Sequence, residues 1–454
     1  MPSNKSPSSV TPIDHLEPAR DDEDDTASIA SSDMSTTSTE MFEHEPFDTF
    51  QSKVSELCRK EWPHLCKDTL TTTRMDGGSY NRVIGIRADS SGEPASWIKL
   101  QVLQFLRNVC PSMIRKTEIR DYVLRTPRNE HAWVGHEIAI LKFLATTSVP
   151  VPSVRTFDLS AENPIGNPYM IQPRLPGKSE LEMYLKLNTQ QRICFAQDLG
   201  SALKEMGNIK SSSPGNLDPD AFLARSSNLQ VLRLHCPPRN AFRQVHSVEP
   251  FVLSTPQTVY EFFVSQFARQ RAYDLTLHRK YLNPWKPFTA IIQHLHRLGF
   301  LNENIYALTH MDLEPRNILI YITSPTNAKL SAILDWDETV FAPTFTNCRP
   351  PPWLWHTEDD GDEELDEAAA NVTPKNADLA AVKMAFKKAA GEKYCKWAYA
   401  TEYRLARDIA KLSIMGICSN DDYDTARRIV REWNELHAKT QLEVCEIFDD
   451  EEDK

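Results

Sequence analysis

The sequence lacks paired cysteines, long apolar runs and an excess of positive charge, and each absence argues against a class of protein. Its nine cysteines form no Cys-x-x-Cys pair, so the pattern indicates reduced thiols in an intracellular protein rather than a zinc site or a disulfide framework. No apolar run approaches membrane-spanning length, and the N-terminus has no apolar signal core. We therefore expect a cytoplasmic protein with no membrane partner.

The net charge of the chain is −12, which argues against a general nucleic-acid or anionic-membrane surface. Much of the excess negative charge lies in the tails and in one internal stretch. The net charge therefore says little about the charge of any pocket. With 41% hydrophobic and 25% charged residues, the rest of the chain has the composition of an ordinary globular protein.

Three segments are too polar to form a core. Residues 1–41 contain 14 Ser or Thr, nine acidic residues and no aromatic residue, so they cannot bury enough surface to offset the entropy lost on ordering. We expect residues 1–45 to form a disordered acidic tail. Residues 356–373 read as an acidic surface loop, and residues 448–454 as a short acidic tail.

The patterned part of the chain begins with Phe50, Val54, Leu57 and Cys58, which share one helical face, and strands follow. The stretch "TTTRMDGGSYNRVIGI" predicts a strand, a glycine turn and a second strand, while "DYVLRTPR" and "NPYMIQPRLPG" predict further strands. "VGHEIAILKFLATT" has the spacing of a helix. We assign residues 46–175 to an N-terminal lobe. Residues 88–120 exceed a typical link between strands and read as an insert.

Helical periodicity dominates the remainder, which we assign to a C-terminal lobe spanning residues 176–447. Thr255 and Pro256 predict a helix start, and the apolar residues that follow keep a helical period. A sheet-rich first third followed by helices indicates an α+β chain with two lobes.

One segment, "ALTHMDLEPRNILIYI", places an acid and an amide five residues apart at the start of a strand. The next strand-like run ends in "ILDWD", and a polar turn joins the two. A hairpin over residues 307–340 would bring Asp312, Asn317 and Asp335 to one end. Carboxylate and amide oxygens suit Mg²⁺ and a hydroxyl nucleophile.

The spacing of these residues resembles the catalytic loop of protein kinases. The combination of "HMDLEPRNILI" and "ILDWD" is most similar to the aminoglycoside phosphotransferase family, in a form typical of filamentous fungi. The resemblance extends over residues 70–345. It implies a bilobal protein-kinase-like fold with a small antiparallel sheet in the N-terminal lobe. It also implies an ATP- and Mg²⁺-dependent enzyme that phosphorylates a small hydroxylated substrate.

The resemblance assigns a role to each site residue. Asp312 would accept or orient the proton of the substrate hydroxyl, and Asn317 and Asp335 would hold Mg²⁺ against the ATP phosphates. Glu137 would pair with the strand cation, Arg125. The remaining residues that it assigns to nucleotide binding are Gly77, Gly78, Ser79 and Asn81 at the phosphates, and Met170 to Gln172 at the adenine.

Several alternatives stay open at this stage. Arg125 stands where many kinases have Lys, so a nucleotide-binding pseudokinase or an interaction protein without turnover is the second hypothesis. We interpret His310 as a support for its loop and Trp336 as core packing. Asp337 and Glu338 either orient an amine-bearing substrate or form an exposed acidic turn. The oligomeric state and the acceptor are not indicated.

Overall fold

A computed structural model describes most of the chain and divides it into two compact units, residues 1–49 and 50–454. The described residues are 45–63, 70–75, 81–88, 120–128, 132–224, 229–238, 250–277, 279, 282–356, 370–439 and 444–445. In the first unit, the Thr49 hydroxyl donates a hydrogen bond to the Pro46 carbonyl. The second unit contains the features analysed below.

Five antiparallel strands form the sheet of the N-terminal lobe, in the order β1-β2-β3-β5-β4. In β3 the buried side chains of Tyr122 and Leu124 alternate with the less buried Asp121, Val123 and Arg125, as a sheet with one covered face requires. The strands span Leu70–Arg74 (β1), Asn81–Ala88 (β2), Arg120–Pro127 (β3), Thr156–Asp158 (β4) and Tyr169–Pro173 (β5).

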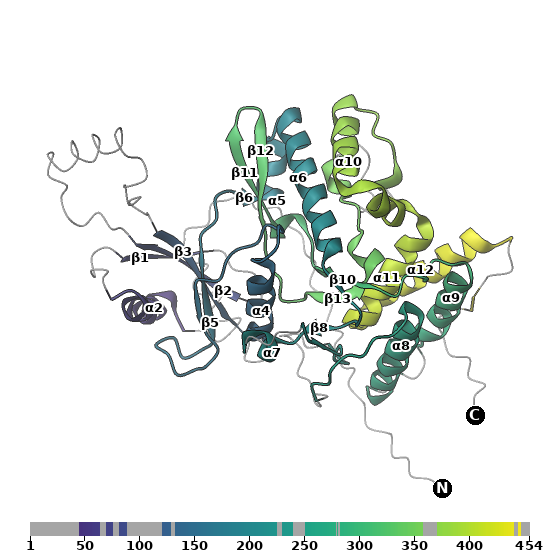
Figure 1. The fold of residues 1–454 in the computed structure, drawn as a ribbon, viewed down its shortest axis with the longest axis horizontal. Helices are drawn as coiled ribbons and strands as arrows, with labels where there is room; N and C mark the ends of the chain where they lie inside the picture. Colours follow the sequence, from purple (N-terminus) through teal and green to yellow (C-terminus); the bar gives the residue numbers. More distant parts are fainter. Residues whose placement is uncertain are drawn as a thin grey trace, which may run out of the picture. The chain divides into compact units, whose positions relative to one another are not determined.

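Two helices accompany this sheet (Figure 1). The first, α2, spans Phe47–Glu61, and the residue that follows it, Trp62, stacks on Tyr122 of β3 with ring centroids 4.7 Å apart. The second, α4, spans Val134–Leu144 and buries most of its side chains. The four strands that the sequence predicts in this lobe are present as β1, β2, β3 and β5, and the predicted helix after β3 is α4.

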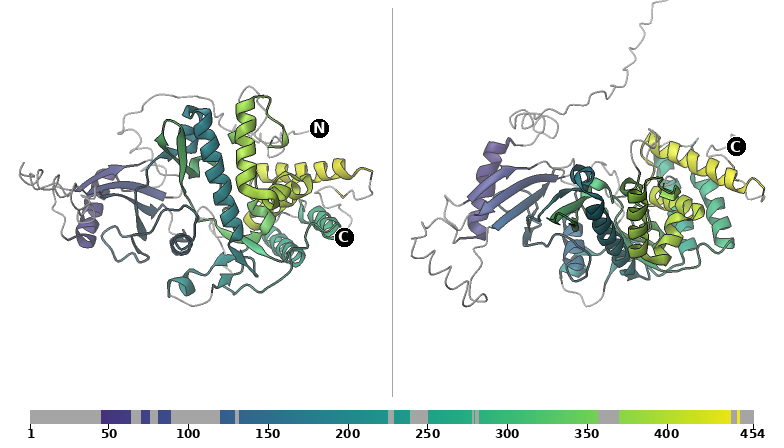
Figure 2. Two further views of the ribbon diagram at one scale, coloured as in Figure 1. Left: turned by 45° about the horizontal axis from the view of Figure 1, so that its top comes forward. Right: turned by 90° about the horizontal axis from the view of Figure 1, so that it is seen from above.

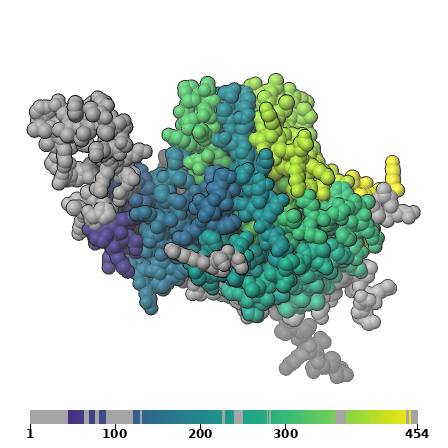
Figure 3. Space-filling model, viewed as in Figure 1, coloured from purple at the N-terminus to yellow at the C-terminus, as the bar shows by residue number. Residues whose placement is uncertain are grey.

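The C-terminal lobe is built around α6, Thr189–Asn208, which starts with a capping box formed by Asn188 and Gln191. Helix α6 lies between the hairpin of β11 and β12 and the long helix α10, Ala377–Tyr399 (Figures 1 and 2). In the space-filling view, the surface of α6 separates the hairpin from α10 in the same way (Figure 3). The hairpin and the C-terminal helices thus share one core.

The predicted catalytic hairpin is formed by β11, Ile318–Ser324, and β12, Asn327–Ile333. A short strand, β10 (Tyr306–Thr309), precedes the hairpin and pairs with β13 (Val340–Pro343), which follows the hairpin. The connecting loop contains the 3-10 turn η4, Pro315–Asn317. The pairing of β10 with β13 and of β11 with β12 therefore holds the loop before β11 close to the segment after β12.

Shorter elements and four further helices complete the described chain. They are β6 (Lys178–Ser179), α5 (Glu180–Met183), η3 (Tyr184–Lys186), β7 (Lys210–Ser211), β8 (Asn216–Leu217), α7 (Pro219–Leu223), β9 (Val231–Leu232), α8 (Val259–Thr276), α9 (Trp285–Arg297), η5 (Thr344–Asn347), η6 (Pro352–Leu354), α11 (Thr401–Met415) and α12 (Asn420–His437). Among the described residues, no helix has both the length and the apolar character needed to span a membrane.

The α+β class and the two lobes expected from the sequence are confirmed, with one local correction. Helix α8 begins at Val259 rather than at Thr255 and Pro256, because Thr258 and Glu261 form a capping box that satisfies the first backbone N–H groups. The glycine turn, the insert between β2 and β3 and most of the acidic segment 356–373 lie outside the described residues.

Gly177 lies at the crossing from the N-terminal lobe into β6, which pairs with β11. Its φ is +107°, and a Cβ atom there would lie 2.2 Å from the Ile320 carbonyl oxygen. A side chain would therefore meet both backbone strain and a clash with rigid backbone.

We predict that Gly177→Ala lowers the free energy of unfolding by about 2–4 kcal/mol, the sum of the left-handed backbone cost and the clash. Gly166→Ala is the matched control, since Gly166 has a φ of +76° but nothing within 4 Å of an added Cβ. It should cost only about 1–2 kcal/mol. Urea unfolding of both variants measures the difference, and equal losses would contradict the clash.

Candidate functional site

The peptide of Leu334 joins the two loops that carry the candidate site. Its N–H donates to the Asn317 carbonyl at 2.7 Å, and its carbonyl accepts a hydrogen bond from His310 Nε2 at 2.8 Å. The adjacent residues Ile318 and Ile333 pair in the hairpin. As a result, the start of β11 and the end of β12 lie side by side. The loops bearing Asp312, Asn317 and Asp335 meet at this end of the hairpin.

Asp312 and Asn317 are in direct contact. The Asn317 Nδ2 group donates to the backbone carbonyl and to the Oδ2 atom of Asp312, both at 2.9 Å. These two bonds fix the orientation of the Asn317 amide. Its Oδ1 atom, an oxygen that can bind a metal, accepts no hydrogen bond from any described residue. The five-residue spacing seen in the sequence therefore produces a real contact.

A third residue, Arg316, also contacts Asp312. Its Nη2 atom lies 2.7 Å from each carboxylate oxygen. The Arg316 side chain is 58% exposed, so the pair is a surface ion pair that contributes little to stability and can open readily. The sequence analysis missed this residue, although its i, i+4 spacing from Asp312 was the available signal.

His310 supports the loop that carries Asp312. Its Nδ1 atom faces the N–H of Asp312 at 3.2 Å, which can only donate, so Nδ1 is the acceptor and Nε2 carries the proton given to Leu334. The ring packs edge-on against Trp336 at 4.8 Å, and Trp336 is fully buried. His310 therefore supports its loop and Trp336 packs in the core, as the sequence predicts.

Asp335 adopts a left-handed backbone conformation with φ of +64°, which Asp tolerates better than most residues. Its Oδ1 atom accepts a hydrogen bond of 2.8 Å from Arg125 Nη2. The other terminal nitrogen of Arg125 donates to Glu137 Oε1. One guanidinium therefore links β3, α4 and the end of the hairpin, and the ion pair between Arg125 and Glu137 that the resemblance implied is present.

The pKa values of Arg125 and Glu137 follow from their burial and from the charged groups next to them. Burial alone would lower the pKa of Arg125, but the carboxylates of Glu137, Asp335 and Asp337 outweigh it and raise the pKa. The guanidinium is therefore always charged. Burial raises the pKa of Glu137 to about 7, against the opposing pull of Arg125. The fork shape of Arg allows both contacts at once, which a single ammonium could not reproduce in the same way.

Helix α4 is tied to the segment after Asp335 through His136, which the sequence analysis did not select. Its Nε2 atom lies 2.9 Å from the Thr339 carbonyl, and its Nδ1 atom lies 3.3 Å from the Leu217 carbonyl. His136 is fully buried and directly precedes Glu137. It therefore holds the position of Glu137 relative to the hairpin.

Two more acids follow the hairpin, and both carry raised pKa values. Burial, with Asp335 nearby, raises the pKa of Asp337 to about 6, and burial next to Asp337 and Asp312 raises that of Glu338 to about 7. Neither carboxylate is fully exposed, so the expectation of a freely exposed acidic turn does not describe them. Negative charge is concentrated at this end of the hairpin.

The donor set decides which metal this end could hold. Within the described residues, no three His, Cys, Asp or Glu side chains are grouped as a metal site. A cation here would therefore rely on Asp335, Asn317 Oδ1 and groups from a ligand. Such partial oxygen coordination suits Mg²⁺ bound together with substrate phosphates and not a structural zinc.

The remaining candidate residues lie along the sheet. The Asn81 carbonyl at the start of β2 accepts a 3.2 Å hydrogen bond from Arg128 Nε. Met170 is buried in β5 with Arg125 on one neighbouring strand and Phe157 on the other. Gln172 is also buried, and its Nε2 atom has no hydrogen-bond partner within the described part of the chain. Three candidates lie outside the described residues: Gly77, Gly78 and Ser79.

Residues 112–346 match the profile of the phosphotransferase enzyme family, which is more than half of the chain. The chain belongs to this family, and its α+β architecture is the protein-kinase-like fold that the sequence resemblance implied. A search among curated proteins found no match.

Solved structures with a similar arrangement are distant in sequence. An ethanolamine kinase from Plasmodium vivax is 12% identical over 90% of this chain and 95% of its own, with a TM-score of 0.46. A candidate aminoglycoside phosphotransferase from Ralstonia eutropha is 12% identical over 84% and 94%, with a TM-score of 0.44. The aminoglycoside phosphotransferase APH(4)-Ia, bound to AMP-PNP and hygromycin B, is 10% identical over 86% and 99%, with a TM-score of 0.41.

The buried state of His310 predicts how stability depends on pH. Burial lowers the pKa of His310 from its ordinary 6.5, so the folded protein keeps the ring neutral while the unfolded chain takes up a proton as the pH falls through about 6.5. Protonation therefore favours unfolding. We expect the wild type to lose up to about 1.4 kcal/mol more stability than His310→Gln between pH 7.5 and pH 5.5.

Urea unfolding at the two pH values measures this difference, because all other titrating groups are shared by the two proteins. Equal losses in the two proteins would show that His310 takes up a proton in the folded state, against the hydrogen-bond assignment above.

Proposed function

We propose that this protein transfers the γ-phosphate of ATP, with Mg²⁺, to a hydroxyl group of a small molecule. The observation that supports this most directly is the meeting of the Asp312, Asn317 and Asp335 loops at the Leu334 peptide. Membership of the phosphotransferase enzyme family agrees with this chemistry.

Asp312 is the proposed base. In the transfer, the substrate oxygen forms a bond to the γ-phosphorus, the bond to the β,γ-bridging oxygen breaks with ADP as the leaving group, and the hydroxyl proton passes to the Asp312 carboxylate. The Asn317 Nδ2 contact holds that carboxylate in place. Arg316 must turn away for the carboxylate to meet a substrate, which its exposure permits.

Asn317 Oδ1 and the Asp335 carboxylate are the proposed Mg²⁺ ligands. The ion, when bound, supplies neutralisation of phosphate charge. Arg125 orients Asp335 through the 2.8 Å contact and is itself oriented by Glu137. These residues act by position and charge, which is the main requirement of phosphoryl transfer.

The nucleotide would lie along the N-terminal lobe. We propose that backbone groups at Gly77, Gly78, Ser79 and Asn81 approach its phosphates. For the adenine, Met170 has a neighbouring strand on each side, so base recognition is more accessible to backbone groups from Gln172 onward.

A second function is a nucleotide-binding protein without turnover. The observation in its favour is the contact of Arg316 with both Asp312 oxygens, which occupies the proposed base. The two hypotheses differ in whether ATP is consumed in the presence of an acceptor.

We predict that Asp312→Asn retains Mg-ATP binding but lowers phosphate transfer by about 10²–10⁴-fold, the usual contribution of a positioned base. Transfer from γ-labelled ATP into a fractionated metabolite extract measures the rate, and Asp424→Asn, an exposed acid on α12, is the control. Turnover equal to the wild type in Asp312→Asn would remove Asp312 from the mechanism.

We predict that Asp335→Asn abolishes most of the Mg²⁺-dependent part of ATP binding. Asn is chosen because it tolerates the left-handed backbone of residue 335. Thermal shifts with ATP are compared in Mg²⁺ and in EDTA. The wild type should show a larger shift in Mg²⁺, and the variant should not. The same Mg²⁺ response in both proteins would contradict the metal role.

A further inference from the structure

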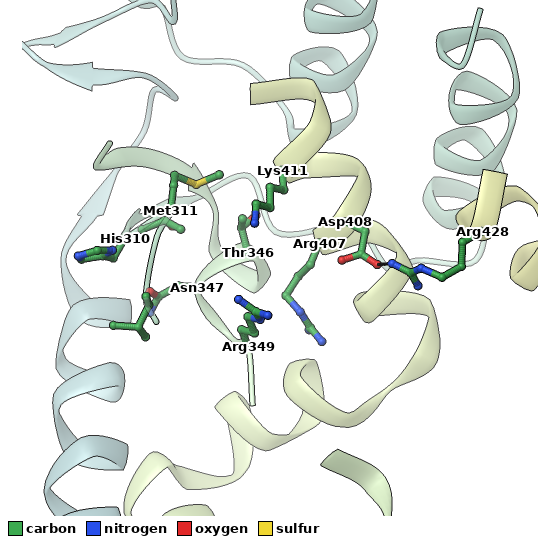
Figure 4. Close-up of a pocket in the computed structure, with 11 residues that line it drawn as sticks. His310, Met311, Thr346, Asn347, Arg349, Arg407, Asp408, Lys411 and Arg428 are labelled. Carbon is green, nitrogen blue, oxygen red and sulfur yellow. Dashed lines mark hydrogen bonds and ion pairs between the residues drawn. The ribbon is translucent and has the colours of Figure 1, made fainter. Parts of the chain in front are cut away.

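A cavity of about 170 Å³ lies next to the catalytic loop. Met311 and Leu313, the neighbours of Asp312, line it on one side, and helices α11 and α12 and the segment after η5 line the other sides (Figure 4). No described residue of the N-terminal lobe lines it. Its location is therefore that of an acceptor site, next to the proposed base and within the C-terminal lobe.

Positive charge predominates in the lining. Four cationic side chains and one carboxylate line the cavity: Arg349, Arg407, Lys411, Arg428 and Asp408. Arg407 and Lys411 are one helical turn apart on α11, and Arg349 reaches the same space from the opposite wall (Figure 4). Charges of one sign held together this closely repel one another, and an anion between them would relieve the repulsion.

The carboxylates near the cavity form ion pairs with cations of its lining. Asp408 accepts a 2.9 Å contact from Arg428, which also contacts Glu432 at 3.0 Å. Arg349 contacts Glu314 at 2.8 Å, and Glu314 is not part of the lining. Asp408, the one carboxylate among the described lining residues, is thus bonded to Arg428 (Figure 4).

Two of these cations differ in how they are held. Arg407 is 3% exposed, and its guanidinium donates to the carbonyls of Trp397 and Ala398 at the end of α10, so its position is fixed. Lys411 is exposed and forms no ion pair or hydrogen bond with a described residue, although Glu338 lies near enough to attract it. A fixed guanidinium beside a movable ammonium is a suitable arrangement for binding an entering anion.

We infer that the acceptor carries an oxyanion, a carboxylate or a phosphate, which binds Lys411, Arg407 and Arg349 while its hydroxyl faces Asp312. This inference rests on the proposed phosphotransferase function. The cavity volume is several times the roughly 30 Å³ that one water molecule occupies, so it accommodates an anionic group with a few carbons. The acids at Asp337 and Glu338 still permit an amine elsewhere on the same molecule.

The first experiment compares acceptors that differ only in the anionic group. ADP formation is measured with glycerate, glycerol 3-phosphate and glycerol, and with homoserine and its methyl ester, each with Mg-ATP. We expect at least tenfold higher kcat/KM for the anionic member of a pair that is used, and the carboxylate and phosphate arms identify which oxyanion fits. Equal use of charged and uncharged members would overturn the inference.

The second experiment does not depend on turnover. Malonate and inorganic phosphate are titrated calorimetrically into the protein saturated with Mg-AMP-PNP, using the wild type, Lys411→Gln and the control Lys388→Gln. Lys388 is an exposed lysine on α10 that is not part of the cavity lining. We expect Lys411→Gln to weaken binding of one probe by about tenfold, the usual effect of losing one charged hydrogen bond, and Lys388→Gln to leave it unchanged.

The two experiments separate the inference from the proposed function. If no acceptor is phosphorylated but Lys411→Gln still weakens probe binding selectively, the oxyanion site stands and the phosphotransferase proposal fails. If the wild type binds neither probe, or if both lysine variants bind equally, the oxyanion site is rejected regardless of the kinase activity.

Discussion

The candidate site depends on the two hydrogen bonds of the Leu334 peptide. One connects the end of β12 to Asn317 and the other connects it to His310, so the loops that carry Asp335 and Asp312 share one attachment. If the hairpin slipped by one residue, the side chain of Asp335 would move to the other face of the strand and lose Arg125. Buried Trp336 and His310 beneath the loops make such a slip costly, because both fill the core with specific hydrogen bonds.

The second constraint is electrostatic and involves both lobes. Arg125 comes from the sheet, Glu137 from α4 and Asp335 from the hairpin, and their contacts link segments up to 210 residues apart in the chain. Breaking one partner would leave a buried charge without compensation, which is far more costly than losing an exposed pair. His136 adds an uncharged connection between α4 and Thr339. The position of α4 is therefore coupled to the segment after β12 by two contacts, one through Glu137 and Arg125 and one through His136.

Much of this arrangement could be predicted from sequence, because the evidence was local. The five-residue spacing of Asp312 and Asn317 and the alternating strands that flank it require only short-range geometry. Arg316 was within reach of the same reasoning and was overlooked. The roles of His136 and Lys411 could not be predicted, because only the fold brings His136 to the Thr339 carbonyl and Lys411 into the same cavity lining as Met311. The start of α8 was misplaced because a capping box at Thr258 outweighs the preference of Pro256 for a first helical position.

The charge of the whole chain also misleads about the site. The chain carries a net charge of −12, yet the cavity beside the catalytic loop is lined mainly by cations. Acidic groups, among them Asp335 and Asp337, lie near Asp312 at the end of the hairpin. Under the proposed function, these carboxylates would lie toward a metal–nucleotide complex and the cations would bind an anionic acceptor. Asp312 would then act between the two, since its neighbours Met311 and Leu313 line the cavity and its carboxylate helps to raise the pKa of Asp337.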